Sequence, residues 1–298
     1  MKLKLSIALF CICNVVVAKD ITTYLNKYKK TGISDYKIEQ NIINKYSYEQ
    51  LESKLNPFFS DTITIARQKA YYFIYKKGTQ IDSIGKKKAT NKLLQGCFDK
   101  NGGIVGVLLS NLTDFDASDF DNKAKETIDR LLEKKKMFHK KELAMLAGIT
   151  NTGHEIMKNL FSSEDETRDT KWGISLALAR QGSVVHINYC FKQISDIPVN
   201  NAFISYIIPD LIYTRQRKLI DFCKDIIFRD TKDCFSPNPD EPEDILCAYR
   251  VMELIAPAIE NFPYRLDATG SLNTDNYKKA LKVTRKWFRD NPDYKIRL

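Results

Sequence analysis

The chain has 298 residues, and its 47 lysines and arginines against 37 aspartates and glutamates give a formal net charge of +10. The length allows one large domain or one elongated array. Seven irregularly spaced cysteines, none in a CxxC pair, exclude a small domain built on disulfide bonds.

The first eighteen residues have the pattern of a signal peptide. Lys2 and Lys4 give a positive start, residues 5–18 are uncharged and apolar, and Val16 and Ala18 suit a cut before residue 19. This run is shorter than the roughly 20 residues that span a bilayer. We therefore predict a signal peptide over residues 1–18 and a mature chain without a transmembrane segment, exported to the periplasm or secreted. An uncleaved N-terminal anchor is the alternative.

Residues 19–60 are predicted to form one or two helices that cap an array, with the lysine-rich residues 27–30 (KYKK) on a polar outer face. The array itself is predicted over residues 61–298. Further basic clusters occur at residues 76–77, 86–88 and 134–141. On long helices such lysines usually form a solvated face. Because export argues against a nucleic-acid partner, the alternative is an anionic polymer such as a glycan, or a membrane surface.

Helical periodicity recurs along the array, whereas strand patterns are sparse. Three stripes would each bury one face of a helix. They are Ala124, Ile128, Leu131 and Leu132; Ile245, Ala248, Tyr249, Met252 and Ile259; and Tyr277, Ala280, Leu281, Thr284 and Phe288.

Residues with capping chemistry lie between the predicted helices. Candidate N-caps are Asp61, Ser83, Asp121 and Ser183, and candidate helix-end glycines are Gly78, Gly148 and Gly182. Residues 113–121, the proline-bearing residues 229–243 and residues 262–275 are predicted connections.

A weak internal repeat joins these helices in pairs. Arg67, Ala70 and Ile74 precede Gly78 at the spacings that Lys171, Ile174 and Leu178 have before Gly182. In each copy a second amphipathic helix follows, at residues 84–97 and 184–194. One helix pair cannot bury its own apolar face, so repeated pairs predict an α-solenoid in which neighbours stack.

Residues 171–194 (KWGISLALARQGSVVHINYCFKQI) resemble a HEAT-type repeat, and residues 64–78 resemble a second, poorer copy. The resemblance implies an all-α fold, an α-α superhelix of antiparallel helix pairs that presents a concave surface to a partner. Thr79 and Ser183 stand where the family usually has an acidic residue after the turn glycine. An armadillo-type or unrelated helical array therefore stays open.

Metal and calcium motifs are incomplete. His154-Glu155 begins an HExxH pattern, but Lys158 replaces the second histidine, and His139 and His186 lie far away in sequence. In the acidic connection, Asp114, Asp116 and Ser118 match the start of a calcium loop, but Asp119 and Lys125 replace the required glycine and glutamate. We predict no metal site and no cofactor.

Motifs for nucleophilic or nucleotide chemistry are absent from the sequence. Paired carboxylates leave one enzymatic alternative, a secreted α/α-toroid that acts on glycans. Its candidate loop carboxylates are Asp230, Asp233, Asp240, Glu241 and Asp267. Against it, only Trp172 and Trp287 are available to stack on sugars, and both fit helix stripes.

The cysteines that follow the predicted cut do not all pair, because five remain. Cys97 and Cys247 fall at apolar helical positions and are predicted to be small buried hydrophobes. A bridge between Cys223 and Cys234 across a loop is the open alternative.

The sequence as a whole predicts a non-catalytic binding or scaffold protein of the cell envelope or exterior. Its partner is expected to be a protein or peptide rather than nucleic acid. No catalytic, cofactor-binding or metal-binding residue is assigned. Tyr71 and Tyr213 are examples of tyrosines that would anchor a partner if they are exposed.

Overall fold

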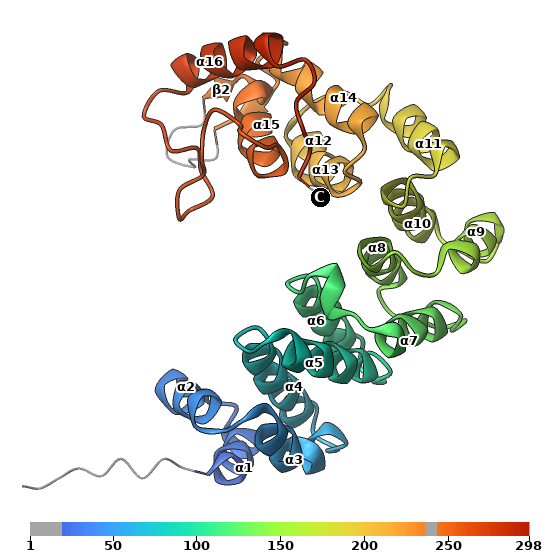
Figure 1. Ribbon diagram of the computed structural model, residues 1–298, viewed down its shortest axis with the longest axis vertical. Coiled ribbons are helices and arrows are strands. Elements are labelled where there is room, and N and C mark those ends of the chain that lie inside the picture. The colour runs from blue at the N-terminus through green and yellow to red at the C-terminus, as the bar shows by residue number, and fades with distance from the viewer. Residues whose placement is uncertain (1–19, 237–242, 298) are drawn as a thin grey trace, which may run out of the picture. The chain divides into compact units, whose positions relative to one another are not determined.

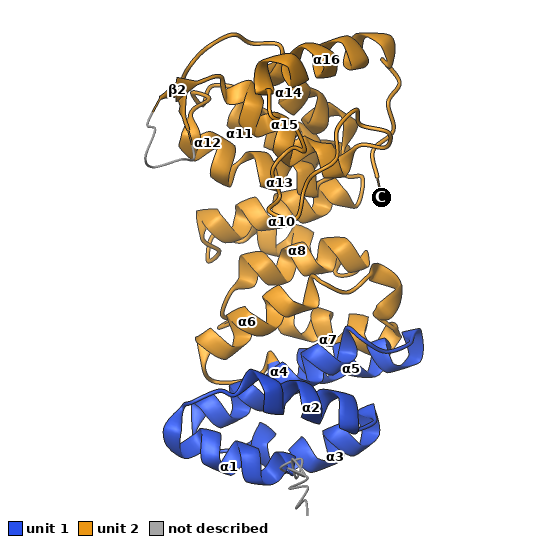
Figure 2. Cartoon of the chain, turned by 90° about the vertical axis from the view of Figure 1, so that its left-hand side faces the viewer, with its two compact units in different colours: residues 1–96 blue, residues 97–298 orange. Residues whose placement is uncertain are grey.

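The computed structural model describes residues 20–236 and 243–297, and the predicted signal peptide lies outside them. The chain divides into two compact units, residues 1–96 and 97–298 (Figure 2). The predicted boundary between a cap and an array, at residue 60, stays a prediction. Among the described residues, no helix combines the length and the apolar character that a bilayer span requires.

Unit 1 is built from five helices, four of which surround the fifth, α4. They are α1 (Ile21–Thr31), α2 (Tyr36–Lys45), α3 (Tyr48–Phe59), α4 (Thr64–Gly78) and α5 (Ser83–Gly96). Helices α1, α2, α3 and α5 all pack on α4 (Figure 1). Leu25, Ile43, Leu51, Phe73 and Leu93 are fully buried. Each comes from a different helix, so the apolar faces share one core.

Unit 2 continues with helices that pack mainly on their neighbours in sequence (Figure 1). They are α6 (Gly102–Leu112), η1 (Ala117–Asp119), α7 (Asn122–Leu132), α8 (Lys140–Thr150), α9 (His154–Ser162), α10 (Arg168–Arg180), α11 (Val184–Ile194), α12 (Asn201–Tyr206), α13 (Ile208–Tyr213), α14 (Arg217–Ile227), α15 (Cys247–Ile255), η2 (Ala256–Ala258) and α16 (Tyr277–Asp290). The prediction of a mostly helical fold with serially packed helices is confirmed.

Both predicted repeat copies form helix pairs. In unit 1, α4 packs against α5, and in unit 2, α10 packs against α11. The second pair turns at Gly182, whose φ of 90° lies in the left-handed region that glycine adopts without strain.

Gly148 was predicted to end a helix, but it lies inside α8. A β-carbon there would come within 2.8 Å of the Ala177 Cα in α10. The two helices approach so closely that only glycine fits at this contact.

The predicted N-caps are partly right. Asp121 accepts a hydrogen bond from the Ala124 amide at 2.9 Å and caps α7, as predicted. Asp61 does not cap α4, because Ile63 holds that position and Asp61 instead pairs with Lys29 at 2.6 Å. Ser83 is the first residue of α5 rather than its cap.

A short β-hairpin interrupts the helices where the sequence predicted only a loop. Strand β1 (Cys234–Phe235) pairs antiparallel with β2 (Asp244–Ile245). Ile245 and Ile259, which the sequence placed on one helical stripe, lie outside α15, in β2 and after η2. Strand pairing and the following 3-10 turn shorten that helix at both ends.

The predicted alternative of a Cys223–Cys234 bridge is wrong, because Cys234 forms a disulfide with Cys247. The hairpin brings the start of α15 beside β1, and the two Cα atoms lie 5.0 Å apart. Cys247 is buried, as predicted, but it is a bridged half-cystine and not a free small hydrophobe. Cys223 stays a buried free thiol in α14, and burial raises its pKa.

Candidate functional site

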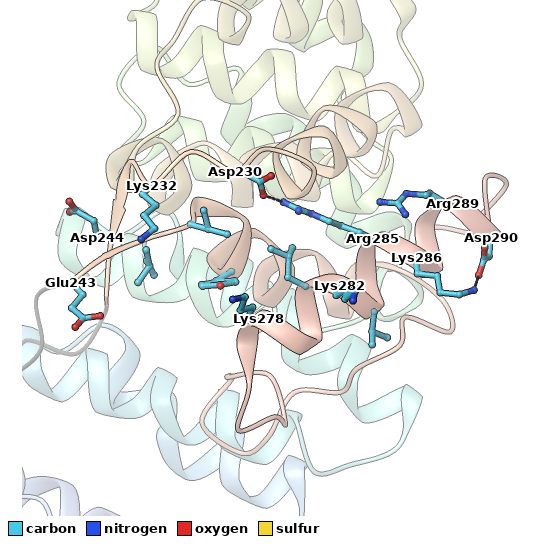
Figure 3. A pocket seen from close by; sticks show the side chains of 15 residues that line it. Asp230, Lys232, Glu243, Asp244, Lys278, Lys282, Arg285, Lys286, Arg289 and Asp290 are labelled. Carbon is cyan, nitrogen blue, oxygen red and sulfur yellow. Dashed lines mark hydrogen bonds and ion pairs between the residues drawn. The ribbon is translucent and has the colours of Figure 1, made fainter.

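An open groove of about 1180 Å³ lies in unit 2 beside α16 (Figure 3). One wall is α16, and the other comes from the hairpin, the residues before it and the first turn of α15. Six basic side chains line the groove: Lys232, Lys278, Lys282, Arg285, Lys286 and Arg289. Four acidic side chains accompany them: Asp230, Glu243, Asp244 and Asp290.

Helix α16 is amphipathic and presents its basic face to the groove. Asn276 caps it by accepting a hydrogen bond from the Lys279 amide at 2.8 Å. Its apolar face is buried through Ala280, Leu281, Thr284 and Phe288. Four of the five basic lining residues of α16, at positions 278, 282, 286 and 289, recur at spacings of three or four and form one row along the exposed side, with Arg285 beside them. The rise of about 1.5 Å per residue makes this row about 16 Å long.

The Cys234–Cys247 disulfide ties β1 to the first residue of α15 and so holds the wall opposite α16. The pairing of β1 with β2 adds hydrogen-bonded support to the same wall. Helix α15 in turn packs on α16 and on α14. The two walls are therefore connected through the core of unit 2.

Arg285 is occupied by the fold. Its Nε donates to the Ile227 carbonyl at 2.8 Å, and its guanidinium also donates to the Arg229 carbonyl at 2.9 Å and to Asp230 Oδ1 at 2.7 Å. The first bond satisfies the carbonyl of the last residue of α14, which has no partner within its own helix, and the second satisfies a carbonyl two residues beyond it. Arg285 thus joins α16 to α14, and we do not count it as available to a ligand.

The other cations divide into one that is paired and four that are not. Lys286 forms an ion pair with Asp290 one turn later. Arg289 lies over the Phe228 ring, 5.7 Å from its centre, but has no carboxylate partner among the described residues. Lys232, Lys278 and Lys282 are exposed and likewise have no ion pair within the described part of the chain.

Three of the four carboxylates stand at the ends of the groove. Figure 3 shows Glu243 and Asp244 at one end and Asp290 at the other, with Lys278 and Lys282 between them. Asp230 is neutralised by Arg285 at 2.7 Å. The middle of the groove is therefore positive, and at this site an anion would meet several cations within one short row.

Apolar side chains complete the lining. Ile245, Leu246 and Tyr249 contribute from the hairpin and α15, and all three are half-buried. The Tyr249 ring makes an edge contact with Tyr277 of α16, with centres 5.7 Å apart. Tyr277 donates a hydrogen bond to Glu253, and burial together with this bond raises the pKa of its phenol to about 12. The phenol therefore stays neutral and positions the aromatic pair beside the groove.

The three histidines have separate partners. His139 Nε2 lies 3.0 Å from the Gly102 carbonyl, and His154 Nδ1 lies 2.8 Å from Gln181 Oε1. His186 is buried, with Nδ1 2.8 Å from Ser183 Oγ, and desolvation lowers its pKa. No group of three metal-ligating side chains comes together in residues 20–236 and 243–297.

The acidic connection at residues 113–121 serves local structure. Asp119 is buried and accepts a hydrogen bond from the Asp116 amide at 3.1 Å. Asp121 caps α7. Asp119, which stands where a calcium loop has its glycine, therefore stabilises η1, and Asp121 stabilises a helix terminus.

The loop carboxylates proposed for a glycan-active enzyme meet different environments. Asp230 lies in the groove beside Arg285, and Asp233 is exposed. Asp267 binds Thr269 and Ser271 within its own turn. Asp240 and Glu241 lie outside the described residues.

The two tyrosines named as possible anchors are not exposed. Tyr71 is 7% exposed, and Tyr213 is half-buried with its hydroxyl donating to the Met145 carbonyl at 2.6 Å. Both side chains pack between two helices and are not available on the surface. The interpretation of these tyrosines as partner anchors is therefore wrong.

The row of cations on α16 escaped the sequence analysis, although its signal was present. The lysine clusters of the sequence analysis are adjacent in sequence, whereas the basic residues of α16, at positions 278, 282, 285, 286 and 289, mostly lie three or four residues apart. The same helix was described only by its apolar stripe. Testing basic residues for helical periodicity would have found this face.

Comparison of the chain with protein-family models, with curated proteins and with solved structures finds no match.

Proposed function

We propose that this protein is a non-catalytic binding module that holds a protein partner through an acidic segment bound in the groove beside α16. The observation that carries the proposal is the row of basic side chains on α16, of which Lys278 and Lys282 have no carboxylate partner among the described residues. Unpaired cations lining a groove favour an anionic ligand, because the ligand supplies the missing charge.

The proposal includes a HEAT-like α-solenoid as the scaffold. Its support is the serial packing of neighbouring helices and the two helix pairs at the predicted repeats. It also includes a location outside the cytoplasm, periplasmic or secreted. The Cys234–Cys247 disulfide is compatible with such an oxidising compartment.

The test measures binding of a fluorescein-labelled hexaglutamate peptide by anisotropy at low ionic strength. The native chain is compared with a Lys278→Glu, Lys282→Glu double variant and with Lys279→Glu. Lys279 is an exposed lysine of the same helix that does not line the groove, so this substitution controls for charge reversal on α16, with half the change in net charge of the double variant.

We expect the double variant to bind at least about tenfold more weakly than the native chain, which corresponds to about 1.4 kcal/mol. The Lys279→Glu control should stay within about twofold, and added salt should weaken native binding. Equal binding by all three proteins would show that the groove is not the site.

A further inference from the structure

The charged side chains that line the groove are not all free to meet a ligand. Arg285 and Asp230 neutralise each other at 2.7 Å, and Lys286 forms an ion pair with Asp290. Six charged lining side chains then remain without an ion pair in the described part of the chain: Lys232, Glu243, Asp244, Lys278, Lys282 and Arg289. These six set the charge that a ligand needs.

The unpaired charges differ between the two walls. On α16 all three are cations, so this wall is positive. On the hairpin wall, the two carboxylates Glu243 and Asp244 face one ammonium group, that of Lys232, which leaves one negative charge in excess. Figure 3 shows both carboxylates at the hairpin end of the groove. The groove is therefore positive along α16 and negative at the hairpin end.

The backbone fixes the two carboxylates at this end. Asp244 pairs with Phe235 across the hairpin, and the Ser236 amide donates a hydrogen bond to the Glu243 carbonyl at 3.0 Å. The disulfide described above ties the same hairpin to α15. Both acidic side chains are exposed, so a ligand reaches them without a rearrangement of the wall.

A ligand that is acidic over its whole length complements only part of this groove. Its carboxylates gain from the cations of α16, but those at the hairpin end meet Glu243 and Asp244, and like charges repel. A basic group at that end of the ligand replaces the repulsion by attraction. Charge complementarity of this kind selects between ligands, because the wrong order of charges is penalised.

We infer that the partner's binding segment carries an acidic stretch along α16 and a basic residue at one end, which faces Glu243 and Asp244. This inference rests on the proposed function and adds the order of charges that the groove recognises. It depends on where the charges of the groove lie and not on the conformation of the bound segment.

Four unlabelled peptides test the order of charges by competing with fluorescein-labelled hexaglutamate for the full chain at low ionic strength. Two carry a terminal lysine, Glu-Glu-Glu-Glu-Gly-Lys and the reversed Lys-Gly-Glu-Glu-Glu-Glu, and in the other two glutamine replaces the lysine. Acetyl and amide groups cap every peptide, so the terminal charges do not contribute. The reversed sequences cover both directions in which a segment can lie in the groove.

In one of the two directions, the lysine peptide should bind at least about threefold more tightly than its glutamine counterpart. The factor is small because the charges are exposed to solvent. The chain as a whole is basic, with a formal net charge of +10. General attraction to this charge would give the opposite order, because the glutamine peptide has one more net negative charge.

A Glu243→Gln, Asp244→Asn variant should lose the preference for lysine. It should bind hexaglutamate at least as tightly as the native chain does, which shows that the wall is still folded. The matched control is Glu164→Gln, Asp165→Asn, at an adjacent exposed glutamate and aspartate between α9 and α10 that do not line the groove. This control changes the net charge equally and should keep the preference.

Each contrary result has a distinct meaning. If the glutamine peptides bind at least as tightly as the lysine peptides in both directions, and the Lys278→Glu, Lys282→Glu variant binds neither, the inference is overturned and the proposed function stands. A lysine preference that survives in the Glu243→Gln, Asp244→Asn variant would also overturn the inference, because the basic end would then bind elsewhere. If neither hexaglutamate nor any of the four peptides binds, the proposed function fails together with the inference.

Discussion

Unit 1 and the α16 row of unit 2 both concentrate lysines. Several lysines of unit 1 are paired within its own fold, whereas among the lysines of the described row only Lys286 has an ion pair. In unit 1, Lys69 Nζ lies 2.8 Å from Glu39 Oε1 and 4.6 Å from the ring centres of both Tyr28 and Tyr72. Further ion pairs in this unit are Lys29–Asp61, Lys54–Asp20, Lys88–Glu49 and Lys92–Glu52. On α16, by contrast, Lys278 and Lys282 have no such partner among the described residues. Positive charge therefore indicates a ligand site only where the fold has not already neutralised it.

The largest expected effect is at the buried pair of unit 1. The side chains of Lys69 and Glu39 are only 11% and 4% exposed. A Glu39→Gln substitution leaves the Lys69 ammonium without its counter-charge in a mostly desolvated site. We expect a loss of about 3 kcal/mol in the free energy of unfolding, measured by urea denaturation.

An exposed pair of the same unit is the control for that substitution. Glu49 pairs with Lys88 at 2.5 Å, but both side chains are largely exposed. Glu49→Gln should leave the urea midpoint almost unchanged, because solvent already screens this pair. Equal destabilisation by the two substitutions would contradict the view that burial makes the Lys69 cluster structural.

The second effect concerns the groove wall that faces α16. A disulfide bond, rather than ion pairs, holds this wall. Replacing Cys234 and Cys247 together by serine opens a loop of 13 residues. The unfolded chain gains entropy, so we expect a loss of about 3 kcal/mol in stability. Hexaglutamate binding should weaken in parallel, because the wall is no longer tied to α15.

A reductant supplies the control for the cysteine substitution. It should lower the stability of the native chain toward that of the double serine variant and leave the variant itself unchanged. An unaltered native chain under conditions that break the disulfide, verified by thiol titration, would refute the structural role of this bond.

The helices of both units were predictable because their signals are local. The stripe at Ala124, Ile128 and Leu131 predicted α7, and all three residues are buried. The segment from 171 to 194 predicted the pair α10 and α11, since a turn glycine and two apolar periods lie within one short stretch. Periodicity of this kind does not depend on the rest of the fold.

The cysteine pairing and the groove depend on tertiary structure. Spacing does not distinguish Cys223 from Cys247 as a partner for Cys234, because the choice follows from how β2 leads into α15. Nor does the sequence reveal that Arg285 is occupied, because its acceptors lie more than 50 residues earlier, at Ile227 and Asp230. Which cations remain unpaired is known only after folding.

A third prediction concerns Asp221, a carboxylate of unit 2 outside the groove whose oxygens accept hydrogen bonds from three side chains. Burial raises the pKa of Asp221, but hydrogen bonds from Lys224, Tyr294 and Arg217 outweigh it and lower the pKa overall. A lowered folded-state pKa stabilises the protein above the unfolded-state pKa of about 3.9, and this stability is lost as the pH falls through the folded-state value.

Asp221→Asn should therefore destabilise the chain at pH 7 by up to about 1 kcal/mol, a modest value because the carboxylate is partly exposed. Below about pH 4 the difference between variant and native chain should shrink. Urea denaturation at pH 7 and at pH 3 measures both values. A difference that grows on acidification would contradict the assigned pKa direction.

The smallest expected effect is on the α16 row itself. Lys278 lies in the first turn of α16, where the helix dipole disfavours a cation and no acidic residue is present. Replacing Lys278 and Lys282 by glutamate removes the cation from the first turn and supplies an acidic residue there. It also places a carboxylate at position 282, four residues before Lys286, which is a favourable helical spacing. Stability should change by less than about 0.5 kcal/mol, toward stabilisation, while hexaglutamate binding is lost.

Opposite responses of stability and binding would show that these lysines serve a ligand at a small cost to the fold. A destabilisation comparable to that of Glu39→Gln would instead make them structural, as in unit 1.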